Sequence, residues 1–102
     1  MITEHAILPI TAGREEEFER AFGVAKNIIA TSPGFLDVSL LRGIENDSSY
    51  LLLVHWESVE AHLTGFRGTP AYDAFRSLLH EFYDSVPVME HFVEVATISA
   101  AR

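Results

Sequence analysis

The chain has 102 residues, the length of one domain, and its 48% hydrophobic content is enough to build a packed core. The net charge of −8 argues against nucleic acid or an anionic membrane as a partner, because binding phosphate groups requires a basic surface. Cysteine is absent, no apolar run reaches the roughly 20 residues of a membrane helix, and the first residues lack a signal-peptide pattern. We therefore expect one domain over residues 1–102, in the cytoplasm, without thiol chemistry.

The first part of the chain predicts a strand, a helix and a second strand. Residues 2–8 alternate in polarity, with Glu4 on the same side as three apolar side chains. A helix is expected to begin at Thr11 or Gly13, and acidic residues follow where the helix dipole favours them. Its apolar face recurs at helical spacing over Phe18, Ala21, Phe22, Ala25, Ile28 and Ile29. Residues 35–42 predict the second strand, with Leu36, Val38 and Leu40 on one face.

The second part predicts a strand, two helical pieces and a final strand. Residues 50–56 are a third strand that is apolar on both sides, and Ser58 is a suitable N-cap for the helix that follows. Glycines and Pro70 divide that helical region, so the second piece is expected to restart near Thr69. An apolar stripe is predicted over Val59, Leu63 and Phe66, and the last strand over residues 88–98.

The order β-α-β-β-α-β predicts a ferredoxin-like α+β fold, with both helices on one face of a four-stranded antiparallel sheet. The other face is then bare. It carries either Tyr50, Leu52, Val54 and Trp56 or the alternate residues Leu51, Leu53 and His55. Either set is too apolar to face water, so we expect a homodimer in which two sheets pack through this open face.

Four motifs, in this order and spacing, resemble the antibiotic biosynthesis monooxygenase family of the dimeric α+β barrel superfamily. The motifs are SPGF (32–35), a strand that ends in WES (56–58), EAHLTGFRGTPAY (60–72) and HEFYDSVPVMEHF (80–92). The resemblance covers nearly the whole chain. It implies a dimeric α+β barrel and an enzyme that oxidises an aromatic or quinol-type small molecule with O₂, using no flavin, haem or metal.

The resemblance also argues against haem degradation. Haem-degrading relatives carry an Asn on the first strand, a Trp in the second helix and a His further along that helix. The corresponding positions here hold Ala6 or His5, then Gly65 or Phe66, then Phe75 or Arg76. Quinol-oxidising relatives often carry a His where this chain has Phe66, which is a further departure from the pattern.

Cofactor-free oxygenation requires an apolar pocket, a general base and hydrogen-bond donors for a developing oxyanion. His62 is the candidate base, because a histidine titrates near neutral pH. Trp56 and His91 are the other candidate catalytic residues, as a donor and as a second titratable group. Each has a structural alternative: a helix His on the apolar stripe, a Trp in the core, and a His that holds the sheet together.

Candidate substrate-binding residues surround these three. They are His55, Phe66, Tyr72, Arg76 and Tyr83. Tyr72 and Arg76 are four residues apart on one helix face, so they could clamp a polar substrate edge or simply stack on the surface. His55 belongs either to the pocket or to the dimer face, and Tyr83 could instead anchor the loop before the last strand.

No cofactor or metal is expected. His5, His55 and His91 lie on three predicted strands, but no ligand spacing supports a metal site, and nucleotide-binding and serine-hydrolase motifs are absent from the sequence. Three functions remain compatible with an apolar pocket that has one polar end. They are a cofactor-independent monooxygenase, a non-catalytic binding or stress-response protein, and an isomerase that acts on an aromatic intermediate.

Overall fold

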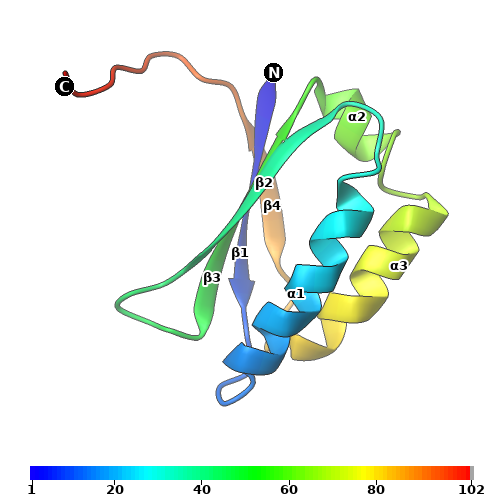
Figure 1. The fold of residues 1–102 in the computed structure, drawn as a ribbon, viewed down its shortest axis with the longest axis vertical. Coiled ribbons are helices and arrows are strands. Elements are labelled where there is room, and N and C mark those ends of the chain that lie inside the picture. The colour runs from blue at the N-terminus through cyan, green and yellow to red at the C-terminus, as the bar shows by residue number, and fades with distance from the viewer. Residues whose placement is uncertain (102) are drawn as a thin grey trace.

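The computed structural model describes residues 1–101 and confirms the expected order of strands and helices (Figure 1). The strands are β1 (Ile2–Pro9), β2 (Phe35–Arg42), β3 (Ser49–Trp56) and β4 (Val88–Phe92). The helices are α1 (Glu15–Ile29), α2 (Val59–Leu63) and α3 (Pro70–Leu79), and α3 continues into a 3-10 turn, η1 (His80–Phe82). All neighbouring strands are antiparallel in the order β2-β3-β1-β4, the ferredoxin-like order with the first and third strands in the middle.

The helices cover only one face of the sheet, and the register decides which side chains they cover. On β3, Tyr50, Leu52, Val54 and Trp56 point toward the helices and are buried. On β1, Glu4 lies opposite Val54 and Ala6 lies opposite Leu52, so these residues share that covered face. The open face therefore carries the alternate set of β3, Leu51, Leu53 and His55, each half-buried.

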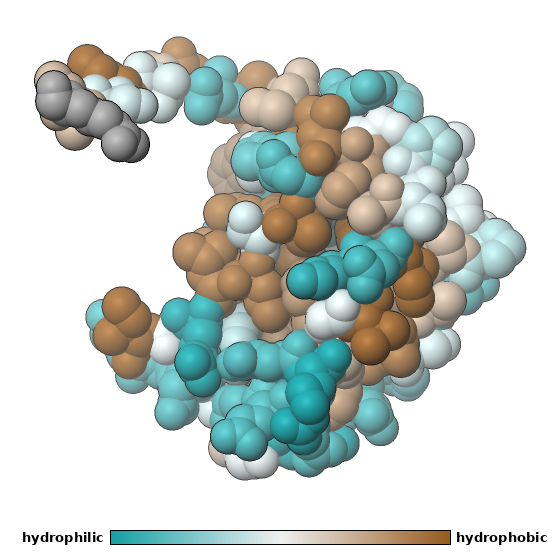
Figure 2. Space-filling view, in the orientation of Figure 1, coloured by the Kyte–Doolittle hydropathy of each residue, from teal (hydrophilic) through white to brown (hydrophobic). Residues whose placement is uncertain are grey.

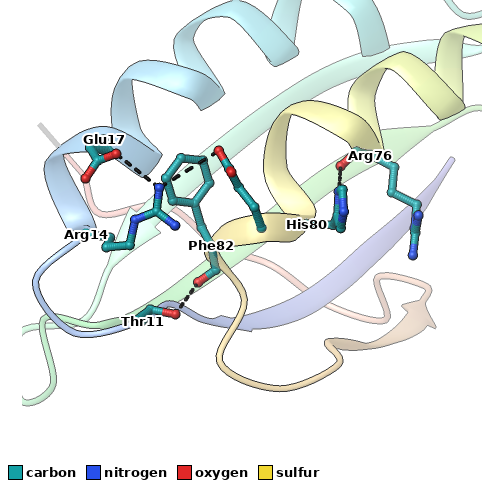
Figure 3. Close-up of polar contacts among 7 residues, drawn as sticks. Thr11, Arg14, Glu17, Arg76, His80 and Phe82 are labelled. Carbon is teal, nitrogen blue, oxygen red and sulfur yellow. Dashed lines mark hydrogen bonds and ion pairs between the residues drawn. The ribbon is translucent and has the colours of Figure 1, made fainter.

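The helix α1 begins at Glu15, later than expected from the sequence. Thr11 does not cap it, because both its backbone N–H and its hydroxyl donate to the carbonyl of Phe82, at 2.8 and 3.1 Å (Figure 3). This contact ties the start of α1 to η1. Arg14, at the N-cap, pairs with Glu17 at 3.1 Å and lies over the ring of Phe82.

The cap predicted at Ser58 is confirmed, and so is the restart of the helical region near Thr69. Ser58 accepts a hydrogen bond from the N–H of Ala61 at 3.1 Å, and Thr69 accepts one from the N–H of Tyr72 at 3.2 Å. The predicted apolar stripe is confirmed at Phe66 and wrong at Leu63. Leu63 is 44% exposed, whereas His62 and Phe66 are buried against the sheet, because α2 is a single short turn whose orientation is fixed by packing.

Gly34 allows α2 to lie close to the start of β2. Its φ of +81° is in the left-handed region, and a Cβ at this position would lie 2.6 Å from the Cβ of Ala61. The backbone conformation and the close approach both require glycine. Since Ala61 is the neighbour of His62, this contact also helps to position the helix that carries His62.

The last strand is shorter than predicted, ending at Phe92 instead of residue 98. Phe92 pairs with Thr3, and β1 itself begins at Ile2, so β1 extends only one residue beyond this pair. Residues 93–101 form no helix or strand, and Figure 1 shows them extending away from the sheet. Leu36 also differs from expectation. It is 44% exposed, because a register shift between Phe35 and Asp37 interrupts the pairing of β2 with β3.

The open face of the sheet is rich in apolar side chains. Ile7, Leu41 and Phe92 are 46%, 47% and 49% exposed there, beside Leu51 and Leu53. Figure 2 shows hydrophobic side chains along the side of the sheet that lacks helices in Figure 1. Within residues 1–101, no helix has the length and apolar character needed to cross a membrane.

Candidate functional site

A cavity of about 510 Å³ lies between the sheet and the helices α2 and α3. Its volume is within the usual range for small-molecule sites. Most of its interior is apolar, lined by Ala6, Leu8, Ile29, Leu52, Phe66 and Phe75. Glu4 and His62 line it as buried polar groups, and the exposed side chains of Arg67, Arg76 and His80 form part of its mouth.

Glu4 is the centre of a buried hydrogen-bonded cluster. The indole Nε1–H of Trp56 donates to its Oε1 at 3.0 Å, and Nε2 of His62 lies 3.3 Å from the same oxygen. On the far side of His62, Nδ1 is 2.8 Å from Nε2 of His91. Nδ1 of His62 is thus hydrogen-bonded to His91, while Nε2 faces the carboxylate of Glu4 in a close polar contact.

Burial shifts the pKa values of Glu4 and His62, the two buried polar groups of the cavity wall, in the directions that favour their neutral forms. Desolvation raises the pKa of Glu4, although the bond from Trp56 and the charge of Arg67 oppose that rise. Desolvation, with smaller contributions from His91 and Arg67, lowers the pKa of His62 to about 4. At neutral pH His62 is therefore uncharged, and its contact with Glu4 is not an ion pair.

Aromatic rings hold this cluster in place. The rings of Trp56 and His62 are stacked with centroids 5.3 Å apart, and Phe66 contacts Trp56 at 5.7 Å. Trp56 is fully buried, and Phe66 is 2% exposed. The polar groups are thus fixed by rigid apolar neighbours that exclude water, which strengthens their interactions.

The mouth of the cavity is cationic and aromatic. Arg67 lies over the ring of Tyr72 at 5.5 Å, and its Nη1 lies 3.7 Å from the sulfur of Met89. Arg76 follows Tyr72 by one turn of α3, and His80 Nδ1 lies 3.0 Å from the carbonyl oxygen of Arg76 (Figure 3). Burial, together with Tyr72, raises the pKa of Tyr83 to about 12, so its hydroxyl keeps its proton at neutral pH.

The structure brings most of the predicted site residues to this cavity. His62, Phe66, Tyr72, Arg76 and Tyr83 line it. Trp56 and His91 do not line it. Trp56 donates a hydrogen bond to Glu4, and His91 is hydrogen-bonded to His62, so both contact lining residues from outside the cavity.

His55 is not a pocket residue. It lies on the open face, where its ring pairs with Asp37 on the neighbouring strand. His5, half-buried on β1, faces the same side, with its ring against Phe92. His91 faces the other side, so the three strand histidines do not converge, and residues 1–101 contain no cluster of three potential metal-binding side chains.

Two residues of the site were not among the candidates. Glu4 had a usable signal, because it is the one charged residue on the inward side of the first strand, and such a residue is costly to bury without a function or a partner. Arg67 was not singled out by the sequence. It contacts Tyr72 and Met89, and no signal in the sequence identified these partners.

Comparisons with known proteins identify relatives of the chain. Residues 1–78 match the family model described as antibiotic biosynthesis monooxygenase. The uncharacterized protein YczJ of Bacillus subtilis is 45% identical over 95 residues, which are 93% of this chain and 100% of YczJ. A mycobilin-producing heme oxygenase of Mycobacterium tuberculosis is 37% identical over 54 residues, which cover 53% of this chain and 51% of that protein.

Solved structures share the fold. A protein from Bordetella bronchiseptica that carries the same family description superposes with a TM-score of 0.90 at 32% identity, covering 93% of this chain and 97% of that one. SnoaB, a cofactor-independent oxygenase from Streptomyces nogalater, superposes with a TM-score of 0.83 over 97% of both chains. At 23% identity, the likeness to SnoaB concerns the fold alone.

Proposed function

Because this chain belongs to the antibiotic biosynthesis monooxygenase family, we propose that it oxidises an aromatic or quinol-type small molecule with O₂ and without a tightly bound cofactor. The observation that carries the proposal is the buried pair of Glu4 and His62 in the wall of an otherwise apolar cavity. An apolar cavity with one basic polar end is what deprotonation of an aromatic substrate requires.

Glu4 is the better candidate for the base, although the sequence favoured His62. Both nitrogens of His62 are engaged, and its lowered pKa makes it a weak base. Glu4 has a raised pKa, and among residues 1–101 its second oxygen, Oε2, has no hydrogen-bond partner. In this mechanism Glu4 takes the substrate proton, while Trp56 and His62 hold the carboxylate in place.

The oxidation then uses the electrons of the substrate itself. For an anthrone, deprotonation at the CH₂ group gives an enolate, and this anion reduces O₂. One oxygen atom enters the ring carbon as a carbonyl, and the other leaves as water with the two hydrogens of the CH₂ group. The protein provides the base, the donors for the developing anion, and an interior from which water is excluded.

Oxygen uptake by chelator-treated protein with a panel of anthrones, naphthols and quinols tests the proposal. We expect Glu4→Gln to lower kcat by about 100-fold or more, the usual contribution of a general base. Glu60→Gln is the matched control, since it makes the same change on an exposed position of α2. A Glu4→Gln protein with the wild-type rate would contradict the mechanism. Binding without oxygen uptake would favour a non-catalytic role, and conversion under argon would favour an isomerase.

Haem degradation is the reaction of the curated relative from Mycobacterium tuberculosis. The described site offers no ready iron ligand on His62, because Nδ1 is hydrogen-bonded to His91 and Nε2 lies 3.3 Å from Oε1 of Glu4. Titration with haemin, followed by its Soret absorbance, tests this reaction separately. A saturable spectral shift that persists in His80→Ala and disappears in His62→Ala would favour haem over the proposed aromatic substrate.

We further propose that two copies of the chain pack through the open face, as a dimeric α+β barrel. The support is the row of half-exposed apolar side chains on that face, Leu51 and Leu53 at its centre and Ile7, Leu41 and Phe92 around them. Such a contiguous surface is too apolar to remain in water, and an identical surface is its natural complement.

A further inference from the structure

The chain is strongly acidic, yet cationic side chains are found at its cavity. Only seven of its 102 residues are Lys or Arg, against 15 Asp and Glu. Two of the seven, Arg67 and Arg76, line the cavity, and His80 lies with them. A local excess of positive charge on a protein of net charge −8 needs a reason at the site where it occurs.

Arg67 and Arg76 differ from Arg14 and Arg42, whose charges are paired with carboxylates on the surface. Arg14 pairs with Glu17 at 3.1 Å, and Arg42 pairs with Glu19 at 3.3 Å. Within residues 1–101, no carboxylate oxygen lies within 4.0 Å of the side-chain nitrogens of Arg67 or Arg76. Arg67 is held instead by the ring of Tyr72 and the sulfur of Met89, neither of which neutralises its charge.

The two arginines relate differently to Glu4. Arg67 is close enough to Glu4 for its charge to lower the pKa of that carboxyl, and both Arg76 and Glu4 influence the pKa of Tyr83, in opposite directions. An anionic ligand group would be repelled near Glu4 and attracted near Arg76 and Tyr83, where a guanidinium and a protonated phenol can both donate hydrogen bonds. The interior offers only apolar walls to the rest of the ligand.

We propose that the ligand of the cavity is an aromatic acid, whose flat apolar body fills the interior and whose anionic group binds Arg76, assisted by Arg67, at the mouth. This inference rests on the proposed function only in that it describes the same substrate. It orients the substrate, because the acidic group at the mouth leaves the opposite end of the ring system for Glu4 and His62.

Anaerobic isothermal titration calorimetry tests the inference with three matched probes: 1-hydroxy-2-naphthoic acid, its methyl ester and 1-naphthol. We expect the acid to bind at least ten times more tightly than the two neutral probes, since a hydrogen bond to a charged group is worth about that factor. Arg76→Gln should remove this preference and leave the affinity for the ester unchanged. Arg67→Gln should reduce it partly, and added salt should weaken binding of the acid alone.

Arg20→Gln is the matched control, because Arg20 is exposed on α1 and does not line the cavity. Equal affinities for the acid and the ester, an acid preference that survives Arg76→Gln, or no binding of any probe at millimolar concentration would each overturn the inference. The two proposals fail separately. Tight binding of the acid without oxygen uptake contradicts only the oxygenase, and uptake with neutral substrates at equal affinity contradicts only the acid preference.

Discussion

Glu4 and His62 illustrate how burial changes the chemistry of common side chains. Exposed, a glutamate and a histidine would both be charged over part of the acidic range. In the cavity wall, desolvation raises the pKa of Glu4 and lowers that of His62. Folding makes Glu4 easier to protonate and His62 harder to protonate. The two groups therefore change the free energy of unfolding in opposite directions as the pH rises.

The effect of His62 on stability can be isolated with His62→Gln. The unfolded chain binds a proton at His62 near pH 6.5, but the folded chain does so only near pH 4. The free energy of unfolding of the wild type should therefore rise with pH across this window, and the variant should lack this rise. The rise in the free energy of unfolding that the wild type shows and the variant lacks should reach about 3 kcal/mol, from 1.36 kcal/mol per pKa unit.

Urea unfolding curves of both proteins at pH 4, 5, 6 and 7 measure this difference. Glu4 contributes the opposite slope above its unfolded pKa of 4.5 and is present in both proteins, so the comparison removes most of its effect. Parallel pH profiles of the two proteins would mean that His62 remains able to bind a proton in the folded state.

At the scale of elements, the position of α2 depends on a glycine in the loop before β2. Gly34 has a φ of +81°, and it permits the chain to pass close to Ala61. The contact joins two segments that both flank the site. An error in this packing would move His62, even though Gly34 itself touches nothing in the cavity.

Gly34→Ala should lower the free energy of unfolding by about 1–3 kcal/mol, the cost of a strained backbone conformation, with a further loss from the close contact with Ala61. Gly23→Ala is the matched control. Gly23 lies in α1, with open space around its Cβ position, so this change should raise stability by about 0.5–1 kcal/mol. Thermal and urea unfolding measure both changes, and equal effects of the two substitutions would refute the argument.

The elements were largely predictable, because their signals are local. The caps at Ser58 and Thr69, the apolar run of β3 and the helical spacing of α1 depend only on neighbours in sequence. The site was less predictable, because its contacts are distant. Trp56 donates to Glu4 on the neighbouring strand, 52 residues away in the sequence, and His62 meets His91 from another element.

The errors have the same origin. α2 spans five residues, so its propensity cannot determine which side faces the sheet, and packing buries His62 where the pattern favoured Leu63. The final strand was predicted to run through residue 98, but a strand also needs a partner, and β1 begins at Ile2. His55 could be assigned to one face only when the register of β3 was known.

At the scale of the whole molecule, one face of the sheet builds the site and the other is the proposed dimer contact. Leu53→Asp should give a monomer, because it would place an unpaired carboxylate in the middle of that contact. Val24→Asp is the control, since Val24 is 57% exposed on the helix α1. Multi-angle light scattering after size exclusion measures the mass. A monomeric wild type, or a dimeric Leu53→Asp protein, would exclude this interface.

The pairing of β1 with β4 has a consequence for synthesis. Glu4 is translated well before His91, yet both side chains contact His62. On the ribosome, a nascent chain can bury Glu4 beneath the helices before β4 exists, but it cannot supply the partner of His62. The cluster is therefore completed only when the final strand joins the sheet, so an incompletely synthesised chain would lack the finished site.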